Sequence, residues 1–196
     1  ITLGAGFAVV LGDNGVVHRG ANVGFGTLDD VTSVATTDTA QSTGGDDVIV
    51  SNGGANVILG GVGGDQITAN AGSENIILGD DGEVHMHLAT DSDVFSYVTG
   101  DGALGDVDSI VAGSNNIILG GFGADEITLG SGTAVVLGDN GVVRRRPDVG
   151  FGTLADVTQV ETTDTLETTG GGDTIVSNGG RNVILGGVGS DVITAN

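Results

Sequence analysis

The chain has 196 residues, of which 39 are glycine, one is proline and none is cysteine or tryptophan. Five arginines against 26 acidic residues give a formal charge of −21, which excludes the basic patches of a nucleic-acid binder, and the lack of cysteine excludes disulfides and thiolate metal sites. Gly, Asp or Asn breaks every apolar run, so no membrane-spanning helix is expected, and an apolar fraction of 38% predicts a folded chain with a thin aliphatic core.

Internal repetition determines the predicted architecture. Residues 1–70 return without a gap as residues 127–196, and about three-quarters of the positions are identical. We therefore divide the chain into a unit, a diverged shorter unit, a copy of the first unit and the start of another, at residues 1–66, 67–126, 127–192 and 193–196. The chain is interpreted as a window from a longer array.

Each unit carries an insertion that begins with an LGDNG or LGDDG motif, at residues 11–15, 78–82 and 137–141. Asn-Gly or Asp-Gly between aliphatic runs is a strong hairpin signal, so the chain is predicted to fold back there and leave the repeat as a β-hairpin arm. The predicted arms span about residues 12–43, 79–107 and 138–170. The motif acids are expected to fix these turns, with metal ligation as the alternative; they are Asp13, Asp80, Asp81 and Asp139.

Outside the insertions the chain has a nine-residue period. Ile49, Ile58 and Ile67 lie nine positions apart, and a polar residue stands two positions before each of them. Nine residues with one inward aliphatic side chain predict a short strand and a glycine-rich turn, and two such repeats complete one coil. A single coil cannot bury its apolar residues, so the coils are expected to stack. The predicted fold class is all-β: a flattened parallel β-solenoid, or β-roll, with inserted β-hairpin arms.

Three nonapeptides resemble the calcium-binding repeat GGxGxDx-aliphatic-x of the RTX (repeats-in-toxin) family: GGVGGDQIT at 60–68, GGFGADEIT at 120–128 and GGVGSDVIT at 186–194. GGDDVIV at 44–50 and GGDTIV at 171–176 match it less fully. The resemblance implies a parallel β-roll that holds Ca²⁺ between turns stacked on one edge, with the motif aspartate and turn carbonyls as ligands.

Carried over to this chain, the resemblance implies metal ligands at six aspartates and seven turn glycines. They are Asp47, Asp65, Asp108, Asp125, Asp173, Asp191, Gly45, Gly61, Gly63, Gly121, Gly123, Gly187 and Gly189. An isolated aspartate beside glycine more often caps its own turn, but these six share one period. Calcium prefers six to eight hard oxygen ligands, and stacked carboxylates repel one another unless a cation lies between them.

The opposite edge departs from the family pattern. Where the family has aspartate, its turns carry Asn56, Asn116, Asn182, Ala8 or Ala134. We expect no metal there, and asparagine amides that hydrogen-bond the turns. If Ile58 points inward, Val57 and Leu59 lie on the outer face. Such an apolar face needs a cover, either the inserted arms or a neighbouring molecule.

Two further groups of side chains carry weaker functional signals. His85 and His87 alternate on one predicted strand face, but no third metal ligand accompanies them, so we interpret them as exposed histidines. Arg144, Arg145 and Arg146 form a basic cluster. It either binds an anionic neighbour or, in the interpretation we favour, is a solvent-exposed run of positive charges that balances nearby acidic residues.

No catalytic constellation accompanies the repeats, because the sequence contains no nucleophile elbow, phosphate-binding loop or zinc signature. We therefore expect no enzyme. We expect an extracellular, secreted or cell-surface calcium-binding repeat of a bacterial adhesin, surface layer or filament that folds and stiffens when Ca²⁺ binds. Its expected partners are calcium ions and neighbouring copies or adjoining repeats, with no nucleic acid and no membrane insertion.

The main alternative is a calcium-binding module for secretion and folding within a larger toxin or hydrolase, which the near-identical long repetition disfavours. A carbohydrate-active solenoid enzyme would need a groove with catalytic residues. An ice-binding solenoid would need threonine at every coil, whereas Thr68, Thr128 and Thr194 recur only every 60 or 66 residues, so it is set aside.

Overall fold

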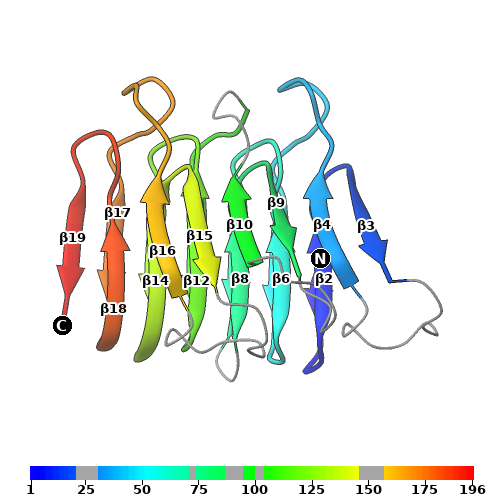
Figure 1. Ribbon diagram of the computed structural model, residues 1–196, viewed down its shortest axis with the longest axis horizontal. Coiled ribbons are helices and arrows are strands. Elements are labelled where there is room, and N and C mark those ends of the chain that lie inside the picture. Colours follow the sequence, from blue (N-terminus) through cyan, green and yellow to red (C-terminus); the bar gives the residue numbers. More distant parts are fainter. Residues whose placement is uncertain (21–30, 71–73, 87–94, 100–103, 146–156) are drawn as a thin grey trace.

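The computed structural model folds the chain into three stacked β-sheets (Figure 1). It describes residues 1–20, 31–70, 74–86, 95–99, 104–145 and 157–196. These residues form strands β1 to β19 and no helix, and hence none that could cross a membrane. The stacked parallel sheets confirm the predicted all-β solenoid.

Sheets A and B are parallel and form the two sides of the solenoid. Sheet A has seven strands in the order β1 (Thr2–Leu3), β5 (Val48–Ser51), β7 (Gln66–Ala69), β11 (Ser109–Ala112), β13 (Glu126–Leu129), β17 (Thr174–Ser177) and β19 (Val192–Ala195). Sheet B has six, in the order β2 (Ala8–Leu11), β6 (Asn56–Leu59), β8 (Asn75–Leu78), β12 (Asn116–Gly121), β14 (Gly132–Asp139) and β18 (Gly180–Leu185). The chain alternates between the two sheets, so one strand from each completes a coil.

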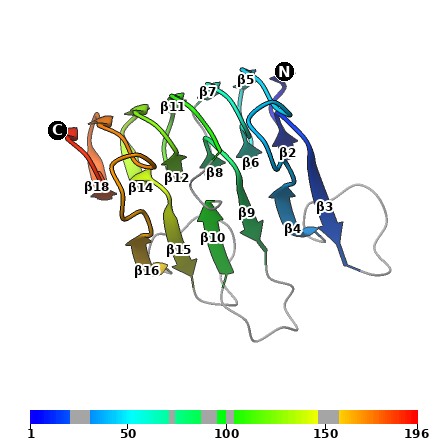
Figure 2. The same ribbon diagram turned by 90° about the horizontal axis from the view of Figure 1, so that it is seen from above.

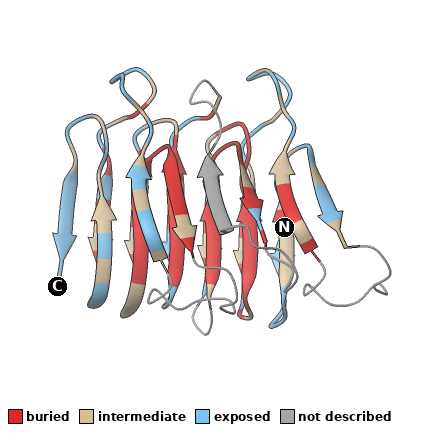
Figure 3. Ribbon diagram, viewed as in Figure 1, coloured by how far each residue is buried: buried red, intermediate tan, exposed pale blue. Residues whose placement is uncertain are grey.

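The solenoid interior lies between sheets A and B and consists of small aliphatic side chains. Ile49, Ile58 and Ile67 are fully buried there, as the nine-residue period predicts. The register is the same from coil to coil, since Ile67 pairs with Ile49 on one side and with Ile110 on the other. Figure 3 shows that burial is concentrated in the central coils, whereas the end strand β19 is exposed.

Sheet C is antiparallel and is built from the inserted arms. Its six strands are β3 (Gly15–Arg19), β4 (Val31–Thr36), β9 (Gly82–His85), β10 (Phe95–Thr99), β15 (Gly141–Arg145) and β16 (Val157–Thr162). Seen from above in Figure 2, it lies against the outer face of sheet B. Val57 and Leu59 of sheet B are fully buried against Val34, Val84 and Val143 of sheet C. The arms therefore supply the cover that this apolar face was predicted to need.

An arm in every second coil gives sheets B and C the same number of strands. Each coil adds one strand to sheet B, whereas each arm adds two strands to sheet C, and both sheets have six. Because neighbouring strands in any sheet lie about 4.8 Å apart, equal numbers keep the two layers in step along the stack. Insertion at alternate coils is thus what allows a continuous third layer.

The Asn-Gly motifs do not form the tight hairpin turn predicted for them. The strands on either side, β2 and β3, lie in different sheets, and β3 pairs with β4 instead. Each motif is a crossover from sheet B to sheet C. At Gly15 a Cβ would overlap the Leu11 side chain and lie 2.6 Å from the Ala35 carbonyl oxygen, so the crossover needs glycine. The turn signal is outweighed by the burial gained when the arm covers sheet B.

The outer face of sheet A carries one row of alternating threonine and valine. In the order of the strands, the row is Thr2, Val50, Thr68, Val111, Thr128, Val176 and Thr194. Threonine therefore stands at every second coil of this sheet and not at every coil.

Candidate metal centre

The acidic rim is the edge of the solenoid at which the chain passes from sheet B to sheet A. One motif aspartate precedes each strand of sheet A after β1, and the six are Asp47, Asp65, Asp108, Asp125, Asp173 and Asp191. The structure brings all six into one row, because the strands that follow them are neighbours in sheet A. Carboxylates that are 17 to 48 residues apart in the chain thereby become adjacent.

The backbone uses one oxygen of each carboxylate after the first. The N–H of Asp47 donates to Oδ1 of Asp65 at 2.7 Å, and the N–H of Asp65 donates to Oδ1 of Asp108 at 2.7 Å. The same bond continues along the row at 2.8, 2.8 and 3.1 Å. This ladder fixes the orientation of the carboxylates and leaves their second oxygens available.

The second oxygen is buried without a partner in the central part of the row. Oδ2 of Asp65, Asp108, Asp125 and Asp173 accepts no hydrogen bond from any described residue. The four residues are at most 1% exposed. Burying an ionised oxygen that lacks a partner is strongly unfavourable, so each of these atoms marks a position that calls for a cation.

Each of these oxygens faces a backbone carbonyl across a glycine. Gly60 lies between Oδ2 of Asp65, in its own turn, and the carbonyl oxygen of Gly79 in the next coil, and a Cβ on Gly60 would overlap both. Gly79 lies in the same way between Oδ2 of Asp108 and the carbonyl oxygen of Gly120. The arrangement recurs at Gly12, Gly120 and Gly138. The absence of a Cβ leaves a space lined by hard oxygens, which are the ligands that Ca²⁺ prefers.

Backbone carbonyls are a necessary part of this site. Among the residues that the structure describes, no three Asp, Glu or His side chains converge on one point. A cation at the acidic rim would therefore take carboxylate oxygens from the row and fill its remaining positions with turn carbonyls. This mixed set of carboxylate and carbonyl oxygens fits Ca²⁺, which accepts irregular shells of six to eight oxygens.

The electrostatics of the metal-free rim also favour a cation. Burial, reinforced by the neighbouring carboxylates, raises the pKa of Asp108 to about 9 and that of Asp125 to about 8. For the same reasons the pKa of Asp65 and that of Asp173 rise to about 7. Without metal these carboxyls hold protons near neutral pH, and a cation that replaces the protons binds more tightly as the pH rises.

Three aspartates of the LGD motifs, Asp13, Asp80 and Asp139, also belong to the acidic rim, and the turn-fixing role predicted for these three is wrong. Oδ1 of Asp80 accepts the N–H of Asp106 at 3.2 Å, and Oδ2 accepts the N–H of Phe122. Both donors lie in segments other than the motif itself. Asp13 and Asp139 are placed in the same way, each accepting an N–H from a later turn of the rim. Asp81, next to Asp80, is buried as well.

The glycines predicted as ligands form the turns of this rim. Six of them have positive φ, from 107° to 131°, namely Gly61, Gly63, Gly121, Gly123, Gly187 and Gly189. Gly45 lies in the same rim with open space at its Cβ position. Their carbonyls as calcium ligands stay a prediction.

The carbonyls that lie beside the buried Oδ2 atoms are not among the ligands predicted from the sequence. Each of these carbonyls belongs to the glycine that directly follows the leucine of a sheet B strand, such as Gly79 or Gly120. A signal for them was present, because a Leu-Gly pair occurs where the chain leaves sheet B in all six coils. The family resemblance implies ligands at later glycines of the turn and not at the glycine that follows the leucine.

The amide rim is the opposite edge, where the chain passes from sheet A to sheet B. Nδ2 of Asn56 donates to Oδ1 of Asn75 at 2.8 Å, and Nδ2 of Asn75 donates to Oδ1 of Asn116 at 2.9 Å. Asn56 and Asn116 also donate to the carbonyls of Gly54 and Gly113 in their own turns. This confirms the predicted amide bonding. Because each amide offers both donors and an acceptor, neighbouring amides bond one another without a cation. Oδ1 of Asn56 is the one oxygen of these three amides that is buried without a partner among the described residues, and it carries no full charge.

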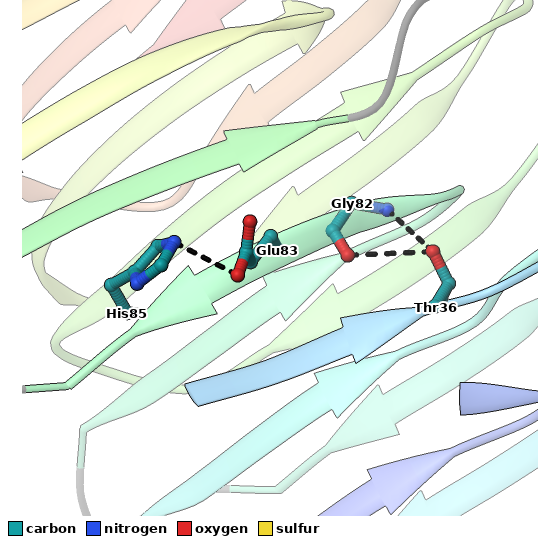
Figure 4. A network of polar contacts seen from close by, with 4 residues as sticks. All are labelled: Thr36, Gly82, Glu83 and His85. Atoms are coloured by element: carbon teal, nitrogen blue, oxygen red, sulfur yellow. Dashed lines mark hydrogen bonds and ion pairs between the residues drawn. The ribbon is translucent and has the colours of Figure 1, made fainter. Parts of the chain in front are cut away.

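His85, Arg144 and Arg145 lie on strands of sheet C. His85 is exposed, and its Nε2 lies 2.9 Å from Oε1 of Glu83 on the same strand (Figure 4). Arg144 donates to Oε1 of Gln159 at 2.7 Å. Arg145 is 2% exposed, so the predicted solvated run is wrong at this position, because strand alternation turns it toward sheet B with Val143. His87 and Arg146 lie outside the described residues.

Comparison with known proteins identifies one family. A model of the RTX calcium-binding nonapeptide repeat matches four copies, at residues 34–67, 50–83, 108–141 and 161–195. The matches together cover more than half of the chain and include all six aspartates of the acidic rim. No curated protein and no solved structure shows significant similarity to the chain.

Proposed function

This chain belongs to the family of RTX calcium-binding nonapeptide repeats, and we propose that it is a structural repeat of an extracellular bacterial adhesin, surface layer or filament. Ca²⁺ binds along the acidic rim, and binding makes the solenoid fold and stiffen outside the cell. The observation that carries the proposal is the row of buried Oδ2 atoms, which face turn carbonyls across glycines and have no hydrogen-bond partner in the described part of the chain.

Folding is coupled to the metal because charge repulsion and conformational entropy both disfavour folding of the metal-free chain. Its net charge of −21 opposes compaction, and ordering 39 glycines carries a large entropy loss. A ligand that binds only the folded state stabilises it by about 2.7 kcal/mol per site when its free concentration is a hundredfold above Kd. Several sites that share one hydrogen-bonded row make the transition cooperative. Such a chain stays exportable where calcium is scarce and folds where it is abundant.

A structural role also suits the three-layer architecture. Both faces of sheet B are buried, one against sheet A and the other against sheet C. A rod with a middle sheet packed on both sides makes a stiff spacer, and its length grows with the number of repeats. The repeat of the first unit at residues 127–192 carries the same LGD and nonapeptide motifs, so further units would extend all three layers.

We further propose that the partners of this chain are adjoining repeats or neighbouring copies of itself. The return of the first unit at residues 127–192 supports this, because each unit continues the same parallel sheets in the same register.

We also propose that the chain has no catalytic activity of its own. The carboxylates of the acidic rim recur at every coil, which suits repeated cation binding, whereas a general acid–base pair would be set apart from the repeat. A larger secreted toxin or hydrolase could use the same calcium chemistry as a folding module. The long and nearly identical repetition favours the structural role, because it multiplies length without adding new chemistry.

Circular dichroism of the purified chain during a calcium titration tests this function, with magnesium as the control ion. We expect little β-structure in chelator, a cooperative gain with calcium, and no gain at equal magnesium, because Mg²⁺ demands a small octahedral shell that this rim does not offer. A fold that is complete in chelator would overturn the proposal.

A further inference from the structure

Acidic-rim turns of two kinds alternate along sheet B. In coils that carry an arm, the residue after the Leu-Gly pair is aspartate, and in coils with a short turn it is glycine. In strand order these residues are Asp13, Gly61, Asp80, Gly121, Asp139 and Gly187. Each aspartate therefore has a glycine in the adjoining coil, which indicates that the two positions fit one another.

Each of these aspartates joins segments that are distant in the chain. Oδ1 of Asp139 accepts the N–H of Gly171 at 3.0 Å, where its arm has returned to the rim, and Oδ2 accepts the N–H of Val188 in the next nonapeptide. Asp80 makes the matching bonds with the N–H groups of Asp106 and Phe122. One carboxylate thus connects the point where the chain leaves the rim to form an arm, the point where the arm rejoins the rim, and the turn of the adjoining coil.

The glycine of the adjoining coil makes room for this carboxylate. Gly121 has a φ of 114°, and a Cβ at this position would lie 2.6 Å from Oδ2 of Asp80. At Gly61 the Cβ would lie 2.8 Å from Oδ2 of Asp13. A side chain there would displace the aspartate, so the short calcium turn and the arm-bearing turn depend on one another.

We propose that Asp13, Asp80 and Asp139 are positioning residues that couple calcium loading of the acidic rim to the docking of the arms as sheet C. Phe122, which donates to Asp80, stands in the turn that contains Gly120 and Asp125. Because Asp80 also holds the return of its arm, the shape of this turn and the position of the arm change together. A cation in the row offsets the repulsion between Asp80 and the rim carboxylates. Asp80 then keeps its hydrogen bonds to the N–H groups of Asp106 and Phe122. This inference rests on the proposed calcium-dependent folding.

Hydrogen exchange followed by mass spectrometry during a calcium titration tests the coupling. Peptides over residues 120–129 report on the rim, and peptides over 141–145 and 157–162 report on the third arm. In the native chain we expect one common calcium midpoint for rim and arm. In Asp139→Asn, an amide group replaces one accepting oxygen, and we expect the arm to need at least tenfold more calcium than the rim. Glu126→Gln, an exposed site with the same change of charge, should behave like the native chain.

A merely structural role for Asp139 would move the rim and arm midpoints by the same factor, and that result would overturn the inference. If Asp139→Asn does not fold even at saturating calcium, Asp13→Asn decides the question, since its arm forms the opposite edge of sheet C. The peptides over the first arm should then separate from those over the rim. If the native chain lacks calcium-dependent protection altogether, the proposed function itself fails, whatever the variants do.

Discussion

The two rims of the solenoid share one backbone design and differ in one recurring side chain, which is aspartate at the acidic rim and asparagine or alanine at or near the start of the sheet B strands. Both consist of glycine-rich turns between parallel strands, and both place a row of side chains in register along the stack. In the amide rim Asn56 donates to Asn75, and Asn75 donates to Asn116. In the acidic rim the backbone ladder uses only Oδ1, and the buried Oδ2 atoms of residues such as Asp108 have no donor among the described residues.

The comparison indicates that a row of buried carboxylates must be neutralised, either by a cation or by protons. Asparagine and aspartate have nearly the same shape, but only the amide brings its own donors. The glycines of the acidic rim, such as Gly60 and Gly79, add the space in which a cation meets both a carboxylate and a carbonyl. We therefore expect calcium dependence to arise at one edge only, and four experiments test this contrast.

The largest effect is expected for Gly79→Ala. Its methyl group would overlap both Oδ2 of Asp108 and the carbonyl oxygen of Gly120, and so fill one calcium position. We expect a loss of about 4 kcal/mol or more in calcium-loaded stability and one fewer ion bound, measured by urea unfolding and calorimetric titration. Gly45→Ala is the matched control, because nothing lies within 4 Å of its Cβ position. Equal effects of the two substitutions would refute the assigned position.

Asp108→Asn should change stability in opposite directions with and without calcium. Its amide oxygen can still accept the N–H of Asp65, but the charge that attracts the cation is gone. We expect the calcium-loaded protein to lose about 3 kcal/mol, the stabilisation given by one well-occupied site. The chelated protein should gain stability, since folding no longer requires protonation of a carboxyl whose pKa is raised to about 9 in the fold. Urea unfolding in calcium measures the loss, and the circular dichroism of the two proteins in chelator measures the gain in folded fraction. A loss in both conditions would speak against a metal at Asp108.

The pH dependence of the chelated protein should be the reverse of ordinary acid denaturation. The pKa values of Asp65, Asp125 and Asp108 are raised to about 7, 8 and 9 in the fold, against about 4 in the unfolded chain. A raised pKa contributes stability that is complete below pH 4 and is lost as the pH rises through 7 to 9. In chelator, thermal melts should therefore show more folded protein at pH 5 than at pH 8.5. In saturating calcium this loss should disappear, and a chelated fold indifferent to pH would exclude the buried acid row.

The smallest effect is expected at the amide rim. Asn56→Ala removes the donors to Asn75 and to the Gly54 carbonyl, which should reduce stability by about 1–2 kcal/mol in calcium. The number of ions bound should stay unchanged, because no carboxylate or turn carbonyl of the acidic rim is touched. Calorimetric titration measures the number, and the loss of an ion would mean that the amide rim also takes part in binding.

The coil and the acidic row could be predicted from the sequence because both follow from a strict period. Ile49, Ile58 and Ile67 recur every nine residues, and one aspartate per coil then has to stack on the next. The sequence predicts that the face with Val57 and Leu59 needs a cover, and the inserted arms are one of the two candidates for it; the structure shows that the arms form this third layer. Its equal strand count with sheet B depends on pairing between arms that are far apart in the chain, which no local pattern records.

The errors arose where local chemistry and tertiary packing disagree. The Asn-Gly of the LGD motifs has the signature of a two-residue hairpin, but the exposed face of sheet B gains more from a crossover that starts at Gly15. Asp80 and Asp139 were expected to serve their own turns, whereas their donors come from residues up to 49 positions away. Arg145 was interpreted by its charge, and the alternation of its strand buries it. In each case the missing information was the identity of the neighbouring segment.

The position of calcium is tested most directly by anomalous diffraction from crystals of this chain grown in calcium. The account predicts calcium peaks along the acidic rim, next to Oδ2 of Asp65, Asp108, Asp125 and Asp173, and no peak along the amide rim. A rim without anomalous signal, or an equal signal beside Asn75, would contradict the account.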